Sequence, residues 1–243
     1  MGKKKERYFR FKKFNCRHEE SSMKIGVDAV LLGAWADVEN VNRVLDVGAG
    51  CGIISLMLAQ RIPSAIITAV EIEEKAAKEA HNNFIESPWQ DRLEILQQNF
   101  LSMNESGEYD LIVSNPPYFD SGVDAGLSDR MLARHEGALS PLSLLHYGKN
   151  MLSPEGRIAL ILPYERSELI VSEALKEGLV PARRCDVRGR ESLTPKRTLL
   201  EFVKTINTYS NFCCSNSYLV LEIENGLPTE EYRELCREFY LKF

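Results

Sequence analysis

The sequence Ser-Asn-Pro-Pro-Tyr, residues 114–118, follows directly on the apolar run YDLIV and combines an amide, two prolines and a phenol. Neither proline has a backbone N–H to donate, so a β-ladder cannot continue through this stretch. The pattern therefore predicts that a buried strand ends here in a rigid turn. That turn would present two hydrogen-bond acceptors, the Asn115 amide oxygen and the Pro116 carbonyl, beside the flat ring of Tyr118.

These acceptors suit chemistry on the exocyclic amine of adenine, which is a poor nucleophile because its lone pair is delocalised into the ring. An acceptor on each N–H returns the lone pair to nitrogen, and an aromatic ring can stack on an extruded base. Holding the amine in line with the group that it attacks is worth ~7–11 kcal/mol of the reaction barrier, so no strong general base is needed. His18 and His135 are expected at the surface. The candidate catalytic residues are Asn115, Pro116, Pro117 and Tyr118; the alternative is a turn that only ends a strand.

A glycine-rich stretch, VLDVGAGCG at residues 44–52, predicts a buried strand that turns into a helix. Glycine lets the backbone approach a ligand closely, and the first helical turn offers free N–H groups. In a doubly wound sheet this turn lies at the carboxyl edge of the first strand, where ligands bind. The G-x-G-x-G spacing is tighter than that of the dinucleotide motif and leaves no evident room for a pyrophosphate. The candidate binding residues here are Asp46, Gly48, Gly50 and Gly52.

The next predicted strand ends in AVEIE, where Glu71 lies about twenty residues downstream and can accept both hydroxyls of a ribose. Ile72 follows it. After the third predicted strand, Asn99 and Phe100 supply a polar group and an aromatic ring placed to bracket an adenine. Together these residues predict a pocket for an adenosine-containing cofactor without phosphates, and S-adenosylmethionine fits. The alternative is a generic strand–helix turn with Glu71 in solvent.

Short apolar runs alternate with helical patterns from residue 43 to about residue 207. Strands that are apolar on both faces and alternate with helices indicate a mainly parallel sheet covered on both sides. Ser140 and Pro141 open one helix, Gly178 closes another, and Thr229 can cap a last one. The predicted strands are residues 43–48, 65–70, 93–98, 109–114, 156–163, 179–189, 197–206 and 217–224, the last as an antiparallel edge; the predicted helices are 28–36, 51–61, 73–86, 140–152, 167–178 and 229–243, with a short strand at 9–14.

The net charge of −5 hides two basic segments on an acidic chain. Residues 1–13 hold seven Lys or Arg and one acid, and residues 183–197 hold six and two acids. Two such segments can steer a polyanion to one face; the alternative is a disordered tail and a solvated strand edge. The candidate RNA-binding residues are Lys12, Lys13, Arg188, Arg190, Lys196 and Arg197.

The six cysteines form no C-x-x-C and no zinc-ligand spacing, so we expect reduced thiols in a cytoplasmic protein and no metal. No apolar run approaches the ~20 residues of a membrane span, and the N-terminus lacks the apolar region of a secretory signal. The stretch 119–139 has no strong periodicity, and long loops of this kind are usually functional or mobile.

Beyond these patterns, VLDVGAGCG, AVEIE, QQNF and SNPPY resemble the amino-methylating class I S-adenosylmethionine-dependent methyltransferases. FKKF, MKIGVDAVLLGAWA, LMLAQR, NNFIESPWQDR and RTLLEF resemble the bacterial tRNA(Val) adenine-N(6)-methyltransferases, over about residues 8 to 204. The resemblance implies a doubly wound, Rossmann-like α/β fold with a seven-stranded, mostly parallel sheet whose last strand is antiparallel. It also implies methyl transfer to the adenine beside the anticodon of a valine tRNA, and a segment MKIGVD folded over the cofactor, with Lys24, Gly26 and Asp28 as contacts.

Two positions depart from the family pattern. Val27 stands where Thr is usual and cannot cap the following helix, so we expect Asp28 to do so. Asn99 stands where Asp commonly contacts the adenine; its oxygen can still accept a hydrogen bond, without charge. Three rival functions share the NPPY chemistry or the pocket: glutamine methylation of release factors, guanine-N(2) methylation of ribosomal RNA, and RNA binding without catalysis.

The expected organisation is a basic extension with the cofactor-covering segment (1–40), a methyltransferase domain (41–207) and a C-terminal strand and helix (208–243). We expect a monomer whose partner is tRNA.

Overall fold

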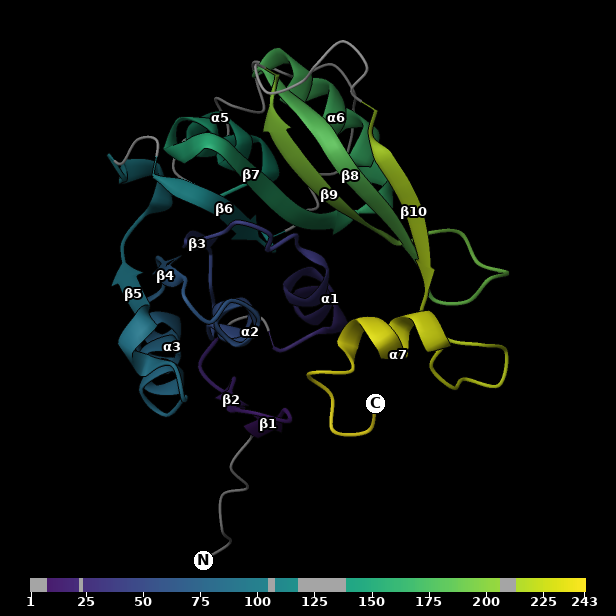
Figure 1. Cartoon of the computed structure of the whole chain (residues 1–243), viewed down its shortest axis with the longest axis horizontal. Helices are drawn as coiled ribbons and strands as arrows, with labels where there is room; N and C mark the ends of the chain where they lie inside the picture. Colours follow the sequence, from purple (N-terminus) through teal and green to yellow (C-terminus); the bar gives the residue numbers. More distant parts are fainter. Residues whose placement is uncertain (1–7, 22–23, 105–107, 118–138, 206–212) are drawn as a thin grey trace, which may run out of the picture.

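The computed structural model describes residues 8–21, 24–104, 108–117, 139–205 and 213–243, and at its centre lies one sheet of eight strands (Figure 1). All neighbouring strands run parallel except β9, which is antiparallel to both β7 and β8. From edge to edge the strands are β10 (Ser215–Val220), β8 (Leu179–Arg188), β9 (Arg197–Lys204), β7 (Leu152–Pro163), β6 (Tyr109–Ser114), β3 (Arg43–Val47), β4 (Ile66–Glu71) and β5 (Leu93–Gln97).

Side chains of the central strands are buried alternately on the two faces of the sheet. In β6, Leu111 and Val113 join one apolar core, whereas Ile112 joins the other. In β7, Ala159 and Ile161 likewise face the first core. The near-continuous apolar runs predicted from the sequence thus follow from burial on both faces, as is usual for parallel sheets.

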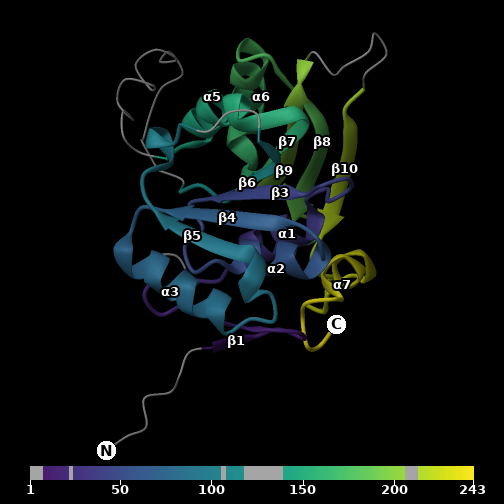
Figure 2. The same ribbon diagram turned by 60° about the vertical axis from the view of Figure 1, so that its left-hand side comes forward.

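Helices cover both faces, as Figure 2 shows: one layer lies below the sheet and the other above it. The first layer comprises α1 (Val27–Trp35), α2 (Ile53–Arg61), α3 (Glu74–Ile85) and α7 (Glu230–Cys236). The second comprises α5 (Pro141–Met151) and α6 (Ser167–Lys176). The described residues also form the short 3₁₀ helices η1 (Gln90–Arg92), η2 (Phe100–Ser102) and η3 (Tyr164–Arg166). In the part of the chain that the structure describes, no helix is both long and apolar enough to cross a membrane.

Several local signals are confirmed. Ser140 caps α5 by accepting a hydrogen bond from the Ser143 N–H over 3.1 Å, with Pro141 as the first helical residue. Thr229 caps α7 through the Tyr232 N–H, and Gly178 follows α6 with a positive φ of 75°. The last predicted helix, however, ends at Cys236 instead of continuing to residue 243.

The prediction of an antiparallel edge at residues 217–224 is wrong. β10 forms the edge, ends at Val220 and pairs parallel with β8, from Ser215 beside Arg183 to Val220 beside Arg188. β9 is already flanked by β7 and β8, so a strand that follows it cannot pair with β9; β10 pairs with β8 instead and runs in the same direction as β8. The seven strands that the family implies are present, with β9 as the antiparallel one, and β10 is an eighth.

The two ends of the described chain pack together beneath α2. A hairpin that the sequence only partly predicts, β1 (Tyr8–Arg10) with β2 (Asn15–Arg17), lies there. Phe11 is buried, stacks on Phe14 with ring centroids 4.6 Å apart, and forms a bridge with Tyr240. The N-terminal and C-terminal segments therefore share one apolar core with the sheet.

Candidate functional site

The predicted binding and catalytic motifs meet at the carboxyl ends of three adjacent strands. β3 pairs with β4 on one side and with β6 on the other, and Asp46 is level with both Ala69 and Val113. The glycine turn after β3, Glu71 at the end of β4, and Asn115 after β6 therefore lie along one edge, on strands ~4.8 Å apart. The chain order reverses between β3 and β6, which is where ligands bind in sheets of this kind.

Glu71 is fixed by the backbone around it. Its side chain is only 9% exposed, Oε2 accepts a hydrogen bond from the Gly50 N–H over 2.8 Å, and Oε1 accepts one from the Glu73 N–H over 3.0 Å. A carboxylate accepts about four hydrogen bonds, so each oxygen keeps capacity for a ligand hydroxyl. This arrangement fits the expected ribose contact, and it is not the solvated side chain of the alternative.

Asp46 lies beneath the turn and is completely buried. Its Oδ2 accepts from the N–H and the hydroxyl of Ser55 at 3.0 and 2.6 Å, so it caps α2 in place of the N-cap Gly52, which has no side chain. Burial raises the pKa of Asp46 to about 6, the Ser55 hydrogen bonds oppose this, and the charge of Glu71 adds to it. Within the described chain its Oδ1 has no hydrogen-bond partner, which leaves one acceptor for a cationic or N–H group of a ligand.

Two glycines of the turn are required by packing as well as by backbone conformation. Gly48 and Gly52 have φ of 70° and 80°. A Cβ at Gly52 would stand 2.4 Å from the Phe84 ring, and one at Gly48 would stand 2.7 Å from Leu139. Their small size therefore lets α3 and the start of the α5 segment approach the turn, a role that the motif alone does not reveal.

The end of β6 is tied to the end of β3, beside the glycine turn. The Ser114 hydroxyl donates to the Val47 carbonyl over 2.7 Å, which ties the ends of β6 and β3 together. Asn115 and Pro117 are half-buried and Pro116 is buried. Tyr118, His135 and almost all of the stretch 119–139 lie outside the described residues.

The residues proposed to bracket an adenine are arranged differently from the expectation. Asn99 uses its side-chain oxygen to accept from the Leu101 N–H over 3.0 Å and so caps η2. Phe100 is 4% exposed within the second apolar core, so its ring presents no open face. Ile72, by contrast, is 56% exposed directly after Glu71 and offers the apolar surface at this end of β4.

The prediction that Asp28 caps α1 is wrong. The N-cap is Gly26, without a side-chain hydrogen bond, and Asp28 is the second helical residue. A capping side chain must precede the helix to fold back onto its amides. Instead, the Asp28 carboxylate accepts from Nε of Arg197, at the start of β9, over 2.7 Å.

The predicted RNA-binding residues of the second basic segment lie around the β8–β9 turn, at the same sheet edge as the glycine turn. In the described chain Arg188 and Arg190 make long ion pairs, 4.0 Å to Glu191 and 3.8 Å to Glu222, and Arg188 also donates to the Glu191 carbonyl over 3.5 Å and lies over the Tyr218 ring. Surface pairs of this length contribute little, so a phosphate can replace them. Lys196 is exposed, and Arg197 pairs with Asp28.

The two predicted lysines of the first basic segment lie elsewhere. The Lys12 ammonium donates to the carbonyls of Arg237 and Phe243, and Lys13 pairs with Glu238 over 3.6 Å. Both side chains thus hold the C-terminal segment against the hairpin. The earlier basic residues, Lys3, Lys4, Lys5 and Arg7, lie outside the described part of the chain.

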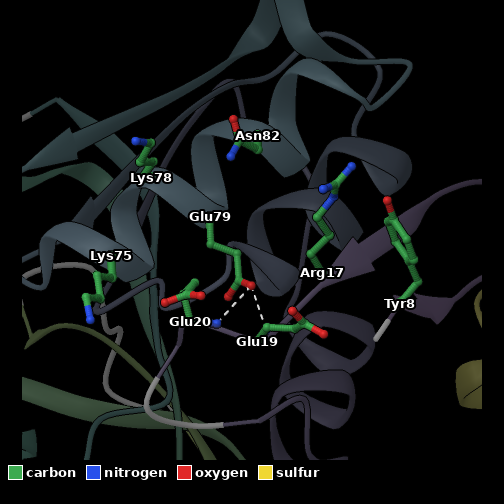
Figure 3. Close-up of a pocket in the computed structure, with 8 residues that line it drawn as sticks. All are labelled: Tyr8, Arg17, Glu19, Glu20, Lys75, Lys78, Glu79 and Asn82. Carbon is green, nitrogen blue, oxygen red and sulfur yellow. Dashed lines mark hydrogen bonds between the residues drawn. The ribbon is translucent and has the colours of Figure 1, made fainter. Parts of the chain in front are cut away.

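A strap, defined as residues 18–21, lies beside the glycine turn and is fixed by residues that the sequence reasoning missed. Glu79 of α3, only 6% exposed, accepts hydrogen bonds from its backbone, as Figure 3 shows for Glu19 and Glu20. Asn83, one helical turn later, bonds to the backbone of Arg17 and to the Cys51 carbonyl. The available signal was two polar residues at i and i+4 on the apolar face of α3.

The predicted contact Lys24 also belongs to this region. Its ammonium donates to the strap carbonyls of Glu19 and Ser21 at 2.8 and 3.2 Å. A groove of about 440 Å³ opens between the strap, the hairpin and α3. Among the described residues, no group of three or more His, Cys, Asp or Glu side chains could hold a metal ion.

Comparison with known proteins agrees with this geometry. A family model described as "Methyltransferase small domain" matches residues 26–162. The tRNA1(Val) (adenine(37)-N6)-methyltransferase of Bacteroides thetaiotaomicron is 40% identical over 235 residues, 96% of this chain and 97% of that protein. Proteins of the same name from Parabacteroides distasonis and Histophilus somni are 42% and 37% identical, over 97% and 100% of this chain and 98% and 100% of their own.

Among solved structures, a predicted O-methyltransferase of Agrobacterium tumefaciens has a TM-score of 0.68 at 18% identity, over 87% of this chain and 96% of that one. At this identity the likeness concerns the fold alone, and the fold is that of class I methyltransferases.

Proposed function

The chain belongs to the family of tRNA1(Val) (adenine(37)-N6)-methyltransferases, and from this premise we propose that it methylates N6 of an adenine beside the anticodon of a valine tRNA. The methyl donor is S-adenosylmethionine. The observation that carries the proposal is the placement of Asn115 after β6, next to the glycine turn of β3 and across it from Glu71.

Four groups at this edge of the sheet fit the cofactor. Glu71 would accept from the ribose hydroxyls, Ile72 would contact the adenine, and the unpartnered Oδ1 of Asp46 would accept from a cationic or N–H group. The turn glycines would allow close approach of the backbone. When bound, S-adenosylmethionine supplies a methyl group on a sulfonium, which is a good leaving group.

The catalytic work of the protein would then be positioning. Asn115 Oδ1 and the Pro116 carbonyl would accept the two N–H groups of the substrate amine, so that its lone pair is localised on nitrogen. Pro116 and Pro117 restrict the backbone that carries both acceptors. Fixed acceptors that strengthen their bonds as charge develops on the amine lower the barrier without a strong base.

The basic residues around the β8–β9 turn would hold the RNA. Arg188, Arg190 and Lys196 lie at the carboxyl edge of the sheet, the same edge as Asn115. An RNA whose phosphate backbone binds these residues would therefore lie on the same side of the molecule as the candidate catalytic residue. Lys12 and Lys13, occupied with the C-terminal segment, are the weaker candidates. The proposal also takes the enzyme to be a cytoplasmic monomer.

The test is mass spectrometry of nucleosides from valine tRNA, isolated from cells with and without the gene and from reactions with the purified protein. We expect N(6)-methyladenosine only where the protein is present. A methylated guanine in RNA, or a methylated glutamine in a release factor, would replace this function by one of its rivals. Their chemistry is close because an amide nitrogen shares the delocalised lone pair, but the relatives named above are all named for adenine methylation of tRNA.

A further inference from the structure

Glu79 is a buried acid without a salt bridge to any described residue, yet its charge is well satisfied by the backbone. Oε1 accepts from the N–H groups of Glu19 and Glu20 at 2.5 and 3.0 Å, and Oε2 accepts from the Ser21 N–H over 3.0 Å. Three N–H donors on one carboxylate make strong charge-assisted bonds. They join α3 to a segment about sixty residues earlier in the sequence.

The strap that Glu79 holds lies directly against the cofactor turn. Ser21 is 3% exposed, and its hydroxyl is so close to Gly50 that a Cβ there would stand 3.1 Å away. The Gly50 N–H in turn donates to Glu71. A continuous contact path thus runs from Glu79 through the strap and Gly50 to the acid proposed to bind the ribose.

The other side of the strap is fixed as well. Lys24 donates to the carbonyls of Glu19 and Ser21, and His18 Nδ1 accepts from the Ile25 N–H over 3.4 Å. Glu79 and Lys24 therefore satisfy the N–H groups and the carbonyls of the same short segment. The strap is held as one unit, and Glu79 is its link to α3.

We propose that Glu79 is a positioning residue for cofactor binding: by holding the strap against the Gly50 turn, it sets the affinity for S-adenosylmethionine without contacting it. The inference rests on the proposed function, because its readout is binding of that cofactor. It assigns Glu79 to the binding step, since the hydrogen bonds that Glu79 makes in the described chain go to the strap beside the Gly50 turn.

The test compares Glu79→Gln with Glu74→Gln in the full chain. Glutamine has the same shape as glutamate but only one acceptor oxygen. Its NH₂ group would therefore face a backbone N–H of the strap, and two donors cannot form a hydrogen bond with each other. Glu74 is exposed on the same helix, and its substitution changes the charge equally. We expect Glu79→Gln to weaken binding of S-adenosylmethionine, measured by calorimetry, about tenfold, and Glu74→Gln to leave it unchanged.

Turnover separates positioning from general damage. With both substrates saturating, kcat of Glu79→Gln should stay within about twofold of the wild type while KM for S-adenosylmethionine rises. Hydrogen exchange at the amides of residues 19–21 should be faster in Glu79→Gln than in Glu74→Gln. Should Glu79→Gln unfold, Glu20→Pro decides the matter, because it removes one donor from an exposed residue and leaves α3 intact.

Unchanged affinity in Glu79→Gln, or a fall in kcat with KM unaltered, would overturn the inference. If the wild-type chain binds no S-adenosylmethionine, the proposed function fails and the inference fails with it, even if exchange still reports a loosened strap. If the wild type binds and only the variant comparison is negative, the proposed function stands and the role of Glu79 is refuted.

Discussion

The backbone N–H of Gly50 donates a 2.8 Å hydrogen bond to Oε2 of Glu71, so the glycine turn after β3 and the acid that ends β4 form one rigid unit. The second oxygen of Glu71 accepts from the Glu73 N–H at the start of α3. The acid is thereby oriented before any ligand arrives. Such preorganisation reduces the entropy that binding must overcome.

Replacing Glu71 by Ala should weaken binding of S-adenosylmethionine by about 1–3 kcal/mol, because the ribose and two backbone N–H groups lose their acceptor. Isothermal titration calorimetry measures this directly. Glu94→Ala, at an exposed position of the neighbouring strand β5, is the matched control and should bind like the wild type. Equal affinities for the two variants would remove Glu71 from the site.

Replacing Asn115 by Ala should abolish most methyl transfer while leaving cofactor affinity nearly intact. The amide oxygen is proposed to contact the substrate amine, whose charge develops only during transfer, so the loss belongs in kcat. Single-turnover methylation of valine tRNA, with calorimetry on the same samples, checks both parts. Asn82→Ala, exposed on α3, serves as control. A variant at Asn115 that keeps wild-type turnover would refute the assigned role.

The affinity for tRNA should fall steeply with salt, because phosphate contacts release counterions. Changing Arg188 and Arg190 to Gln should lower the slope of log affinity against log salt by about two, roughly one for each lost contact. Filter binding at several salt concentrations provides the slopes. Lys176→Gln, on α6 and paired with Glu173, should leave the slope unchanged. Parallel lines for wild type and the double variant would mean that tRNA docks elsewhere.

The buried Asp46 predicts a distinctive pH dependence of stability. Burial raises its pKa from the ordinary value of 3.8 to about 6, so the folded state binds this proton more tightly than the unfolded state. The contribution of Asp46 to the free energy of unfolding therefore rises as the pH falls from 7 through 6. It reaches its full size near pH 3.8, the ordinary pKa of this carboxyl in the unfolded chain. Above pH 6 the carboxylate is charged in the folded and the unfolded state, and burial of this charge lowers the free energy of unfolding.

Urea unfolding of the wild type and Asp46→Asn at pH 5, 6 and 7 tests this. We expect the free energy of unfolding of the wild type to increase relative to that of Asp46→Asn as the pH falls, by at most about 1.4 kcal/mol per pH unit. Asp91→Asn, at an exposed residue of η1, should follow the wild type throughout. A constant difference between wild type and Asp46→Asn would show that Asp46 does not titrate in this range.

Local patterns in the sequence were sufficient for most of the helices and strands and for the position of the candidate site residues at strand ends. The glycine turn, the acid at the end of β4 and the prolines after β6 were predictable because each depends on a strand end and a few neighbouring residues. The parallel sheet followed from the same runs, since strands apolar on both faces require cover on both sides. The caps of α5 and α7 were equally local.

Tertiary structure alone decided the partners of the polar side chains and the last strand. Asp28 meets Arg197 from 169 positions away, and Lys12 meets the C-terminal carbonyls from 225 and 231 positions away. Periodicity places Glu79 on the apolar face of α3, but its partners in the strap come from about sixty residues earlier in the chain. Periodicity determines which face a residue occupies, but not which distant segment covers that face. The pairing of β10 has the same cause: β9 is enclosed by β7 and β8, so β10 pairs with β8, and this is a property of the assembled sheet that no stretch of the sequence contains.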